Sequence, residues 1–351
     1  MRGVVARQLQ QGVFYYFCYN TYMEKFKKSK YIFVIGIGGS DLASKAVWDA
    51  ITLHKKTDKK IYFLESPDER EYEEIENIVE NEIKKLEDFV LIVVSKSGET
   101  AETLETFNKI FEIMSKMPFD TINERILIIS TPNSTLWKIA EEKEAEKIEW
   151  EGNTGGRFSA FTVAHTTVLS IAGLDVENFI IGSKEIKEEE TKHLARNIFD
   201  NYKNDFNILD FFIFNSELED LGKWCRQLIA ESISLITPTV SIGPVDLHSM
   251  LELYLGGPKN RFTIFILSLK ENQNNINQTA FENVTDAYQK AGLPFIKYEM
   301  AEINEKELGS FMAFMMATTI ELAKLLGVDP YDQPAVEEYK SEIRSTKSEI
   351  N

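Results

Sequence analysis

The chain alternates between continuous apolar runs of strand length and stretches with helical spacing, and this pattern constrains its fold most strongly. Continuous apolar runs are typical of parallel strands that are buried on both faces of a sheet. Strands and helices in alternation predict an α/β fold with a doubly wound parallel sheet. In the first half of the chain, the predicted strands are 31–37, 60–64, 89–94 and 125–130, and the predicted helices are 101–116, 136–147 and 158–172.

The same alternation restarts beyond a charged segment at 182–190, which we interpret as a domain junction. We therefore predict two doubly wound, parallel-sheet α/β sandwich domains with a helical C-terminal tail. In this half, the predicted strands are 208–214, 262–267 and 294–298, and the predicted helices are 307–326 and 335–347. The predicted boundaries are 1–30 for an N-terminal helical segment, 31–181 for the first domain, 182–315 for the second and 316–351 for the tail.

The charge balance restricts what the protein can bind. The sequence has 56 acidic residues against 39 basic ones, for a formal net charge of −17. This balance argues against a general binder of nucleic acid or of anionic membranes, so an anionic ligand needs a local pocket of donors. The longest apolar runs are too short to span a bilayer, and we expect no membrane partner.

Two cysteines, Cys18 and Cys225, are too few for a disulfide framework and lack metal-ligand spacing. Three histidines, at 54, 165 and 193, show no pairing that suggests a zinc site, and His165 is expected to be a core or helix-face residue. The apolar stretch at 13–19 is followed by charged residues without a cleavage site, so we interpret it as an amphipathic helix. We expect a cytoplasmic protein without a metal site.

The first predicted strand ends in a glycine-rich turn at 36–41, with the sequence Gly-Ile-Gly-Gly-Ser-Asp. Glycines between a strand and a helix let the backbone approach a ligand closely and direct N–H groups at it. One alternative is a tight turn selected for packing. Another is a dinucleotide-binding fingerprint, but Asp41 occupies the position of its third glycine, which disfavours a dehydrogenase.

The third predicted strand ends in a hydroxyl-rich segment at 95–103 that opens another helix. Backbone N–H groups and the helix dipole favour an anion at such a position, and each hydroxyl adds a donor. An ordinary N-cap is the alternative, but it needs only one hydroxyl. The segment therefore predicts a phosphate site, in which the carboxylate of Glu99 has to point outward.

Several segments, in order along the chain, resemble signature motifs of the phosphoglucose isomerase family, which is built from two sugar isomerase (SIS) domains. The resemblance extends from about residue 34 to residue 340, which is nearly the whole chain. A departure follows Glu231 and Ser232, where the family commonly has Gly-Lys and this chain has Ile-Ser-Leu at 233–235. The similar segments are 36–41, 95–97, 155–159, 227–232, 246–249 and 331–340.

The resemblance implies reversible conversion of glucose 6-phosphate into fructose 6-phosphate, through ring opening and a cis-enediol, with no cofactor and no metal. It implies that Glu231 transfers the proton between C1 and C2 and that Arg157 steadies the charged enediol. His248 and Lys340 match the pair that opens the ring. In this family the histidine enters from the neighbouring subunit, which implies a homodimer.

The resemblance also implies a set of substrate-binding residues. Gly39 and Ser40 match residues that contact the sugar, and Gln227 and Gln333 match residues that position it. The predicted phosphate-binding residues are Ser95, Lys96, Ser97 and Thr100.

The residues around Glu231 support this chemistry independently. Gln227 and Glu231 are four residues apart, so a helix presents both on one face. Ser216 and Glu219 form a candidate capping box for this helix, and a desolvated carboxylate serves well as a general base. Asp246 is a candidate to orient His248. The predicted inward stripe of the helix is Leu221, Cys225, Leu228 and Ser232.

Three alternative functions compete with this interpretation. A bifunctional phosphoglucose/phosphomannose isomerase uses the same paired domains. The isomerase half of a glutamine-dependent amidotransferase would require an ammonia-producing domain with an N-terminal cysteine nucleophile, whereas Arg2 follows Met1 here. A non-catalytic sugar-phosphate-binding regulator would be expected to have lost the base.

Overall fold

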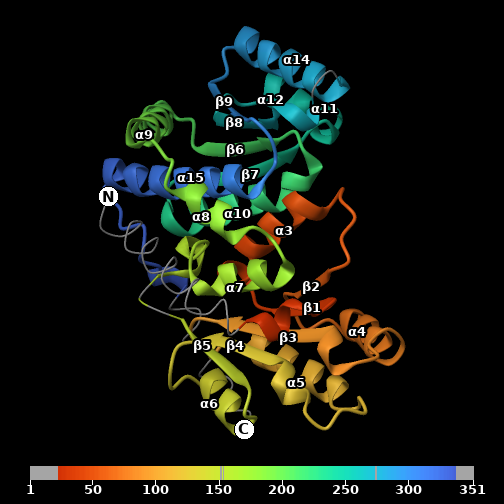
Figure 1. The fold of residues 1–351 in the computed structure, drawn as a ribbon. Helices are drawn as coiled ribbons and strands as arrows, with labels where there is room; N and C mark the ends of the chain where they lie inside the picture. The colour runs from red at the N-terminus through yellow and green to blue at the C-terminus, as the bar shows by residue number, and fades with distance from the viewer. Residues whose placement is uncertain (1–22, 151, 153, 273–274, 337–351) are drawn as a thin grey trace.

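The computed structural model describes residues 23–150, 152, 154–272 and 275–336. In this part of the chain, two parallel sheets lie on either side of a shared layer of helices, and further helices cover their outer faces (Figure 1). The predicted α/β class with two sheets is therefore confirmed. Cys18, Lys340 and most of the predicted N-terminal segment lie outside the described residues, and the domain boundaries remain predictions.

The first sheet contains the four predicted strands and one more, in the order β2-β1-β3-β4-β5. The fifth strand was missed, because the predicted helix at 136–147 ends earlier. Glu144 adopts a left-handed conformation with φ of 53°, which terminates the helix, and a short polar edge strand follows. The strands are β1 (Tyr31–Ile35), β2 (Lys60–Leu64), β3 (Phe89–Ser95), β4 (Ile126–Ser130) and β5 (Glu146–Glu149).

Both faces of this sheet are buried, as its continuous apolar strands require. Along β1, Phe33 and Ile35 pack in one hydrophobic cluster with α4, α5 and α6, whereas Ile32 and Val34 pack in another with α7. The predicted helix at 158–172 begins late, because a 3-10 turn, η4 (Gly156–Phe158), precedes it. The helices are α4 (Glu69–Asn81), α5 (Ala101–Met114), α6 (Thr135–Glu142) and α7 (Val163–Ala172), and the short α2 (Glu24–Lys27) lies near α7.

The second sheet has the order β7-β6-β8-β9, and all its strands are parallel. Strand β7 was missed because it is an edge strand with alternating hydroxyl residues and a proline, and so lacks a continuous apolar run. The strands are β6 (Ile208–Ile213), β7 (Thr237–Ile242), β8 (Arg261–Ser268) and β9 (Phe295–Met300), and the outer helices are α11 (Val245–Ser249), α12 (Leu251–Gly256), α13 (Leu269–Asn272) and α14 (Ile276–Ala291).

The shared helical layer lies between the two sheets (Figure 1) and packs on the second sheet through one hydrophobic cluster and on the first sheet through another. Its longest helix, α15, packs so closely on α8 that glycine is required at both crossing points. A Cβ on Gly182 would lie 1.9 Å from the carbonyl oxygen of Lys306, and one on Gly309 would lie 2.0 Å from that of Phe179. The helices of this layer are α3 (Leu42–Thr52), α8 (Val176–Ser183), α9 (Glu188–Lys203), α10 (Glu219–Ser232) and α15 (Glu305–Leu326), together with α7.

Helix α15 is long and apolar enough to cross a membrane when only length and composition are considered. However, 72% of its most apolar window is buried inside the protein. Burial of this kind is what a core helix of a globular protein shows, and it accounts for the hydropathy of α15.

From β1 the chain adds β2 on one side of the sheet and then β3, β4 and β5 on the other side. The carboxyl ends of β1 and β3 are therefore the topological switch point of the first sheet. Ligands of open α/β sheets bind at such points. In the second sheet, the corresponding point between β6 and β8 is closed by Asn215, which accepts hydrogen bonds from Ser268 N and Asn272 Nδ2, both at 2.9 Å. The first sheet therefore provides the better place for a site.

Candidate active site

Glu231 lies near the C-terminal end of α10, and its carboxylate is held on both oxygens. Gln227, one helical turn earlier, donates from Nε2 to Oε1 at 2.8 Å. Oε2 accepts from Gln333 Nε2 at 3.0 Å and from Arg157 Nη1 at 3.3 Å. The structure thus brings together four residues that were predicted for the site.

The predicted inward stripe of α10 is confirmed, because all four of its residues are buried. The predicted capping box is wrong. A 3-10 turn, η5 (Ser216–Leu218), precedes the helix, so Leu218 is the N-cap and makes no side-chain capping bond. Beyond the helix, Ile233 is buried in the central core, whereas Leu235 is exposed.

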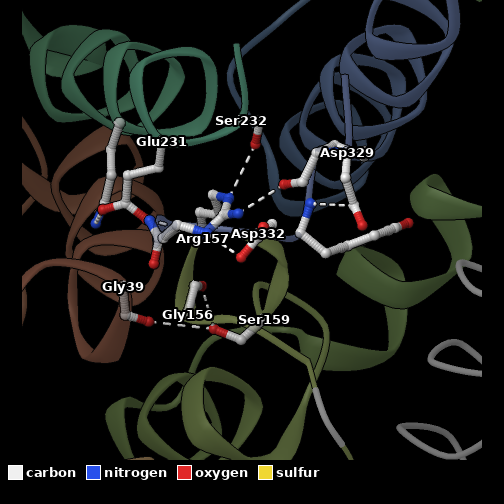
Figure 2. A network of polar contacts seen from close by, with 12 residues as sticks. Gly39, Gly156, Arg157, Ser159, Glu231, Ser232, Asp329 and Asp332 are labelled. Atoms are coloured by element: carbon white, nitrogen blue, oxygen red, sulfur yellow. Dashed lines mark hydrogen bonds and ion pairs between the residues drawn. The ribbon is translucent and has the colours of Figure 1, made fainter. Parts of the chain in front are cut away.

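Arg157 belongs to η4, and its side chain is only 2% exposed. Three polar partners hold this buried guanidinium in place. Besides Glu231, its Nε donates to Ser232 Oγ at 2.9 Å and its Nη2 donates to the Pro330 carbonyl at 2.6 Å. Figure 2 shows Arg157 at the centre of this network. Burial lowers the pKa of Arg157, while the Glu231 carboxylate opposes that shift. Arginine nevertheless remains charged at neutral pH.

The glycine-rich turn after β1, which includes η1 (Gly38–Ser40), lies directly against these residues. A Cβ on Gly39 would lie 2.5 Å from the Cα of Gly156, so the two backbones are in contact and a side chain has no room. A Cβ on Gly38 would lie 3.0 Å from Gln227 Nε2, and Gly38 has a φ of +59°. The turn therefore touches both η4 and α10.

The hydroxyl-rich loop after β3 is adjacent to this turn, because β1 and β3 are paired in the sheet. Ser95 Oγ accepts from the Gly98 amide at 3.1 Å and lies 3.3 Å from Thr100 Oγ1. Ser97 Oγ lies 3.5 Å from the same Thr100 atom, and Lys96 is half-buried between the two serines. Thr100 is the N-cap of α5, but its side chain makes no capping bond, so the ordinary N-cap alternative does not explain its hydroxyl.

Glu99 points away from this loop. Its two carboxylate oxygens accept from the amide and the hydroxyl of Thr135, at 2.8 Å and 2.9 Å. Thr135 is the first residue of α6, so Glu99 stabilises the N-terminus of that helix. This geometry is the outward orientation that a phosphate site needs.

His248 is exposed on α11, next to the second sheet. Asp246 does not orient it, because the Asp246 carboxylate accepts from Ile242 N and Ser249 Oγ, both at 2.7 Å. Among the described residues, no hydrogen bond joins His248 to the group around Glu231. Lys340 lies outside the described residues.

Three participants in this site were not recognised from the sequence. Ser232 was placed only on the inward stripe of α10, yet it accepts a hydrogen bond from Arg157. Pro330 contributes a backbone carbonyl, which no side-chain motif can signal. His165 was expected to be a core or helix-face residue; it is fully buried, but it also hydrogen-bonds to the carbonyl oxygen of Gly39. In the described part of the chain, no cluster of three or more His, Cys, Asp or Glu side chains is arranged to hold a metal.

Comparisons with known proteins identify the family. A family model described as phosphoglucose isomerase matches residues 20–204. The glucose-6-phosphate isomerase of Methanocaldococcus jannaschii is 27% identical over 92% of this chain and 86% of its own, and that of Mycoplasmoides gallisepticum is 29% identical over 89% and 82%. A crystal structure of a glucose-6-phosphate isomerase from Chlamydia trachomatis shares the fold, with a TM-score of 0.77 and 19% identity over 98% of this chain and 75% of that one. Because the family model matches more than half of the 351 residues, the chain belongs to the phosphoglucose isomerase family.

Proposed function

We propose that the protein interconverts glucose 6-phosphate and fructose 6-phosphate as an aldose–ketose isomerase. Its family and its relatives named glucose-6-phosphate isomerase support this activity. The structural observation that carries the proposal is the Glu231 carboxylate, which is oriented by side-chain donors on both oxygens. A carboxylate positioned in this way is suited to proton transfer between neighbouring carbons.

We assign the proton transfer to Glu231. In the aldose-to-ketose direction, the carboxylate takes the proton from C2 and returns it to C1 of the enediol. A carboxylate oxygen has two lone pairs. Oε2 accepts two hydrogen bonds, from Gln333 and Arg157, which occupy both of its lone pairs. Oε1 accepts one, from Gln227, and so has one lone pair left. The second lone pair of Oε1 is therefore the proposed proton acceptor, and the side chain is 32% exposed, so a substrate can reach it.

We assign the stabilisation of the enediol to Arg157. Its guanidinium is fixed by Ser232 and Pro330, so its charge is already in place when negative charge develops on the substrate oxygens. Donors that are oriented in advance need no reorganisation during the reaction, and a single such donor commonly contributes about 10²–10³ in kcat. Gln227 and Gln333 hold the base and are proposed to position the sugar as well.

We propose that the phosphate binds to the loop after β3, with Ser95, Lys96, Ser97 and Thr100 as its ligands. The hydroxyl of Thr100, which caps no amide of α5, and the N-terminus of α5 support this assignment, since both supply donors to an anion. The neighbouring turn after β1 would then contact the sugar through Gly39 and Ser40. β1 and β3 are paired, and Gly38 of the turn lies against Gln227, so this loop, the turn and the residue that holds Glu231 are successive neighbours along which the sugar phosphate is proposed to lie.

We also propose that the protein forms a homodimer in the cytoplasm. Its His248 would open the sugar ring in the site of the partner subunit, together with Lys340. The support is that His248 is exposed and flanked on α11 and α12 by exposed apolar residues, with Val245 65% and Leu253 52% exposed. In the proposed dimer, the interface would cover these side chains.

The test is conversion of fructose 6-phosphate, followed by coupling the product to a dehydrogenase. We expect activity in the wild type and a loss of about 100-fold or more in Glu231→Gln, the scale of a lost general base. The matched control is Glu219→Gln, which removes a carboxylate paired with Lys223 on the same helix and should leave kcat unchanged. A folded wild type that binds fructose 6-phosphate without turnover would instead indicate a non-catalytic regulator.

A further inference from the structure

His165 is a fully buried histidine whose two ring nitrogens contact Gly39, Ser44 and Ser159. It lies on α7, in the helical layer between the two sheets. Its Nδ1 lies 3.2 Å from the Ser44 amide nitrogen. Its Nε2 lies 3.1 Å from the carbonyl oxygen of Gly39 and 2.9 Å from Ser159 Oγ. One side chain thus connects α7, the start of α3, the turn after β1 and the turn after η4.

The hydrogen-bond network defines the tautomer of His165. The Ser44 amide can only donate, so Nδ1 accepts and the ring proton is on Nε2. Ser159 has one hydroxyl proton, and its Oγ lies 2.5 Å from the Gly156 carbonyl and 3.1 Å from that of Gly39. Ser159 donates this proton to a carbonyl, so its Oγ can accept from His165 Nε2–H. The same Nε2–H is also within hydrogen-bond distance of the Gly39 carbonyl. Burial lowers the pKa of His165 to about 4, which keeps the ring neutral at neutral pH.

The contact with Ser44 replaces a missing helix cap. Asp41 is the N-cap of α3, but its side chain makes no capping bond. Ser44 is the third residue of that helix, and its amide is one that an N-cap side chain usually satisfies. His165 supplies this acceptor from another helix, so it secures the first turn of α3 and the residues that lead into it.

The contact with Gly39 secures the turn itself. Gly39 lies with its backbone against that of Gly156, and the neighbouring Gly38 lies against Gln227. Figure 2 shows Gly39 and Ser159 joined by a hydrogen bond close to Arg157. A change in the position of Gly39 would therefore be transmitted to η4, which carries Arg157, and to the glutamine that holds Glu231.

We propose that His165 is a positioning residue, which holds the turn at 38–40 at the distance from η4 and α10 that sugar binding requires. This inference rests on the proposed isomerase function. The contacts separate it from simple core filling, because the ring nitrogens satisfy polar groups of the turn and of α3, which an apolar side chain of similar size cannot do.

Three variants test the proposal. His165→Leu removes both polar contacts, whereas His165→Gln retains an N–H donor near the position of Nε2. The control Val168→Ala shortens a fully buried apolar side chain on the same helix, which belongs to the hydrophobic cluster of the first sheet and carries no polar group. It should lower the melting temperature without affecting the turn.

The measurements are kcat and KM for fructose 6-phosphate well below the melting temperature, with hydrogen–deuterium exchange of the segment 36–45. We expect His165→Leu to raise KM about tenfold or more with a smaller loss of kcat, as for a binding contact that is made in both ground and transition states. Its segment 36–45 should exchange faster than in Val168→Ala. His165→Gln should recover most of the wild-type KM.

A wild-type KM and wild-type exchange in His165→Leu, with only a lower melting temperature, would overturn the proposal. If His165→Leu fails to fold, His165→Asn takes its place, because this side chain is too short to reach the carbonyl of Gly39. If the wild type shows no turnover, the proposed function fails. In that case, exchange of the segment 36–45 still decides the role of His165, since it does not depend on activity.

Discussion

Arg157 lies 3.3 Å from the Glu231 carboxylate, yet its two shorter hydrogen bonds are to Ser232 and Pro330, at 2.9 Å and 2.6 Å. The guanidinium is therefore oriented mainly by its surroundings and only weakly by the proposed base. Such an arrangement leaves Glu231 able to take up a proton without releasing Arg157. It also makes the orientation of Arg157 dependent on a hydroxyl that does not itself touch the carboxylate.

Ser232→Ala is expected to lower kcat about tenfold with little change in KM. The substitution removes the acceptor for Arg157 Nε and leaves a buried, charged donor unsatisfied, which also costs about 1–3 kcal/mol of stability. Steady-state kinetics and urea unfolding measure the two effects. Ser232→Thr keeps the hydroxyl and should retain most of the activity.

The control for this prediction is Ser216→Ala, since the Ser216 hydroxyl lies 3.2 Å from Nε2 of the exposed His54 and makes no hydrogen bond with Arg157 in the part of the chain that the structure describes. It should leave kcat and stability close to the wild type. Wild-type kcat in Ser232→Ala would show that Pro330 and Glu231 are sufficient to orient Arg157.

Gly39→Ala is expected to lower kcat/KM by about 100-fold or more, because displacement of a site by about 1 Å can have this effect. Its Cβ would lie 2.5 Å from backbone atoms of Gly156, which cannot rotate away as a side chain could. The control is Gly292→Ala. Gly292 has a φ of +67° and no neighbour in the way, so the control should lose about 1 kcal/mol of stability but no activity. Equal activity losses in both variants would contradict a specific role of the contact with Gly156.

Glu99→Ala is expected to destabilise the protein without improving phosphate binding. The substitution removes the acceptor for the Thr135 amide at the start of α6, a loss of about 0.5–2 kcal/mol. Because the carboxylate faces Thr135, KM should remain within about twofold of the wild type, as expected for a solvent-screened charge. By contrast, Thr100→Val should raise KM about tenfold by removing a proposed ligand of the phosphate. A clear fall of KM in Glu99→Ala would show that Glu99 repels the phosphate.

The sequence predicted every central strand of the two sheets, and two of the four edge strands, β2 and β9, but it missed the edge strands β5 and β7. Every residue of β1 and β3 is buried, so their apolar runs are uninterrupted. β5 reads Glu-Lys-Ile-Glu and β7 contains Pro238, and only some of their residues are buried, so neither shows a distinct period. At an edge, pairing with one neighbour decides the structure, and single-sequence patterns carry little of that information.

The site was predictable where it depends on local geometry. The spacing of Gln227 and Glu231 on a helix is a local property, and their hydrogen bond is observed. The partners of Arg157 are not local, because Pro330 is 173 residues away and provides only its backbone. The expected pairing of Asp246 with His248 was wrong because Asp246 instead accepts from the backbone of the preceding strand.

His165 should make the stability of the wild type decrease between pH 6.5 and pH 4. Burial lowers its pKa from 6.5 to about 4 in the folded protein, so the unfolded chain binds the proton first as the pH falls. His165 therefore contributes to the free energy of unfolding above pH 6.5, and its contribution is lost as the pH falls towards 4. The difference of about 2.5 pH units corresponds to about 3 kcal/mol.

Urea unfolding of the wild type and of His165→Gln at several pH values between 7 and 4 measures this contribution. Carboxylates also titrate in this range, but both proteins contain the same carboxylates, so the difference between the two curves isolates the histidine. At pH 7 the wild type should be the more stable, because its ring satisfies both Ser44 and Gly39. As the pH falls, its advantage should shrink and then reverse, since glutamine has no proton to gain. Parallel curves would mean that the ring protonates equally well in the folded and unfolded states, and so that it is not buried in the way described.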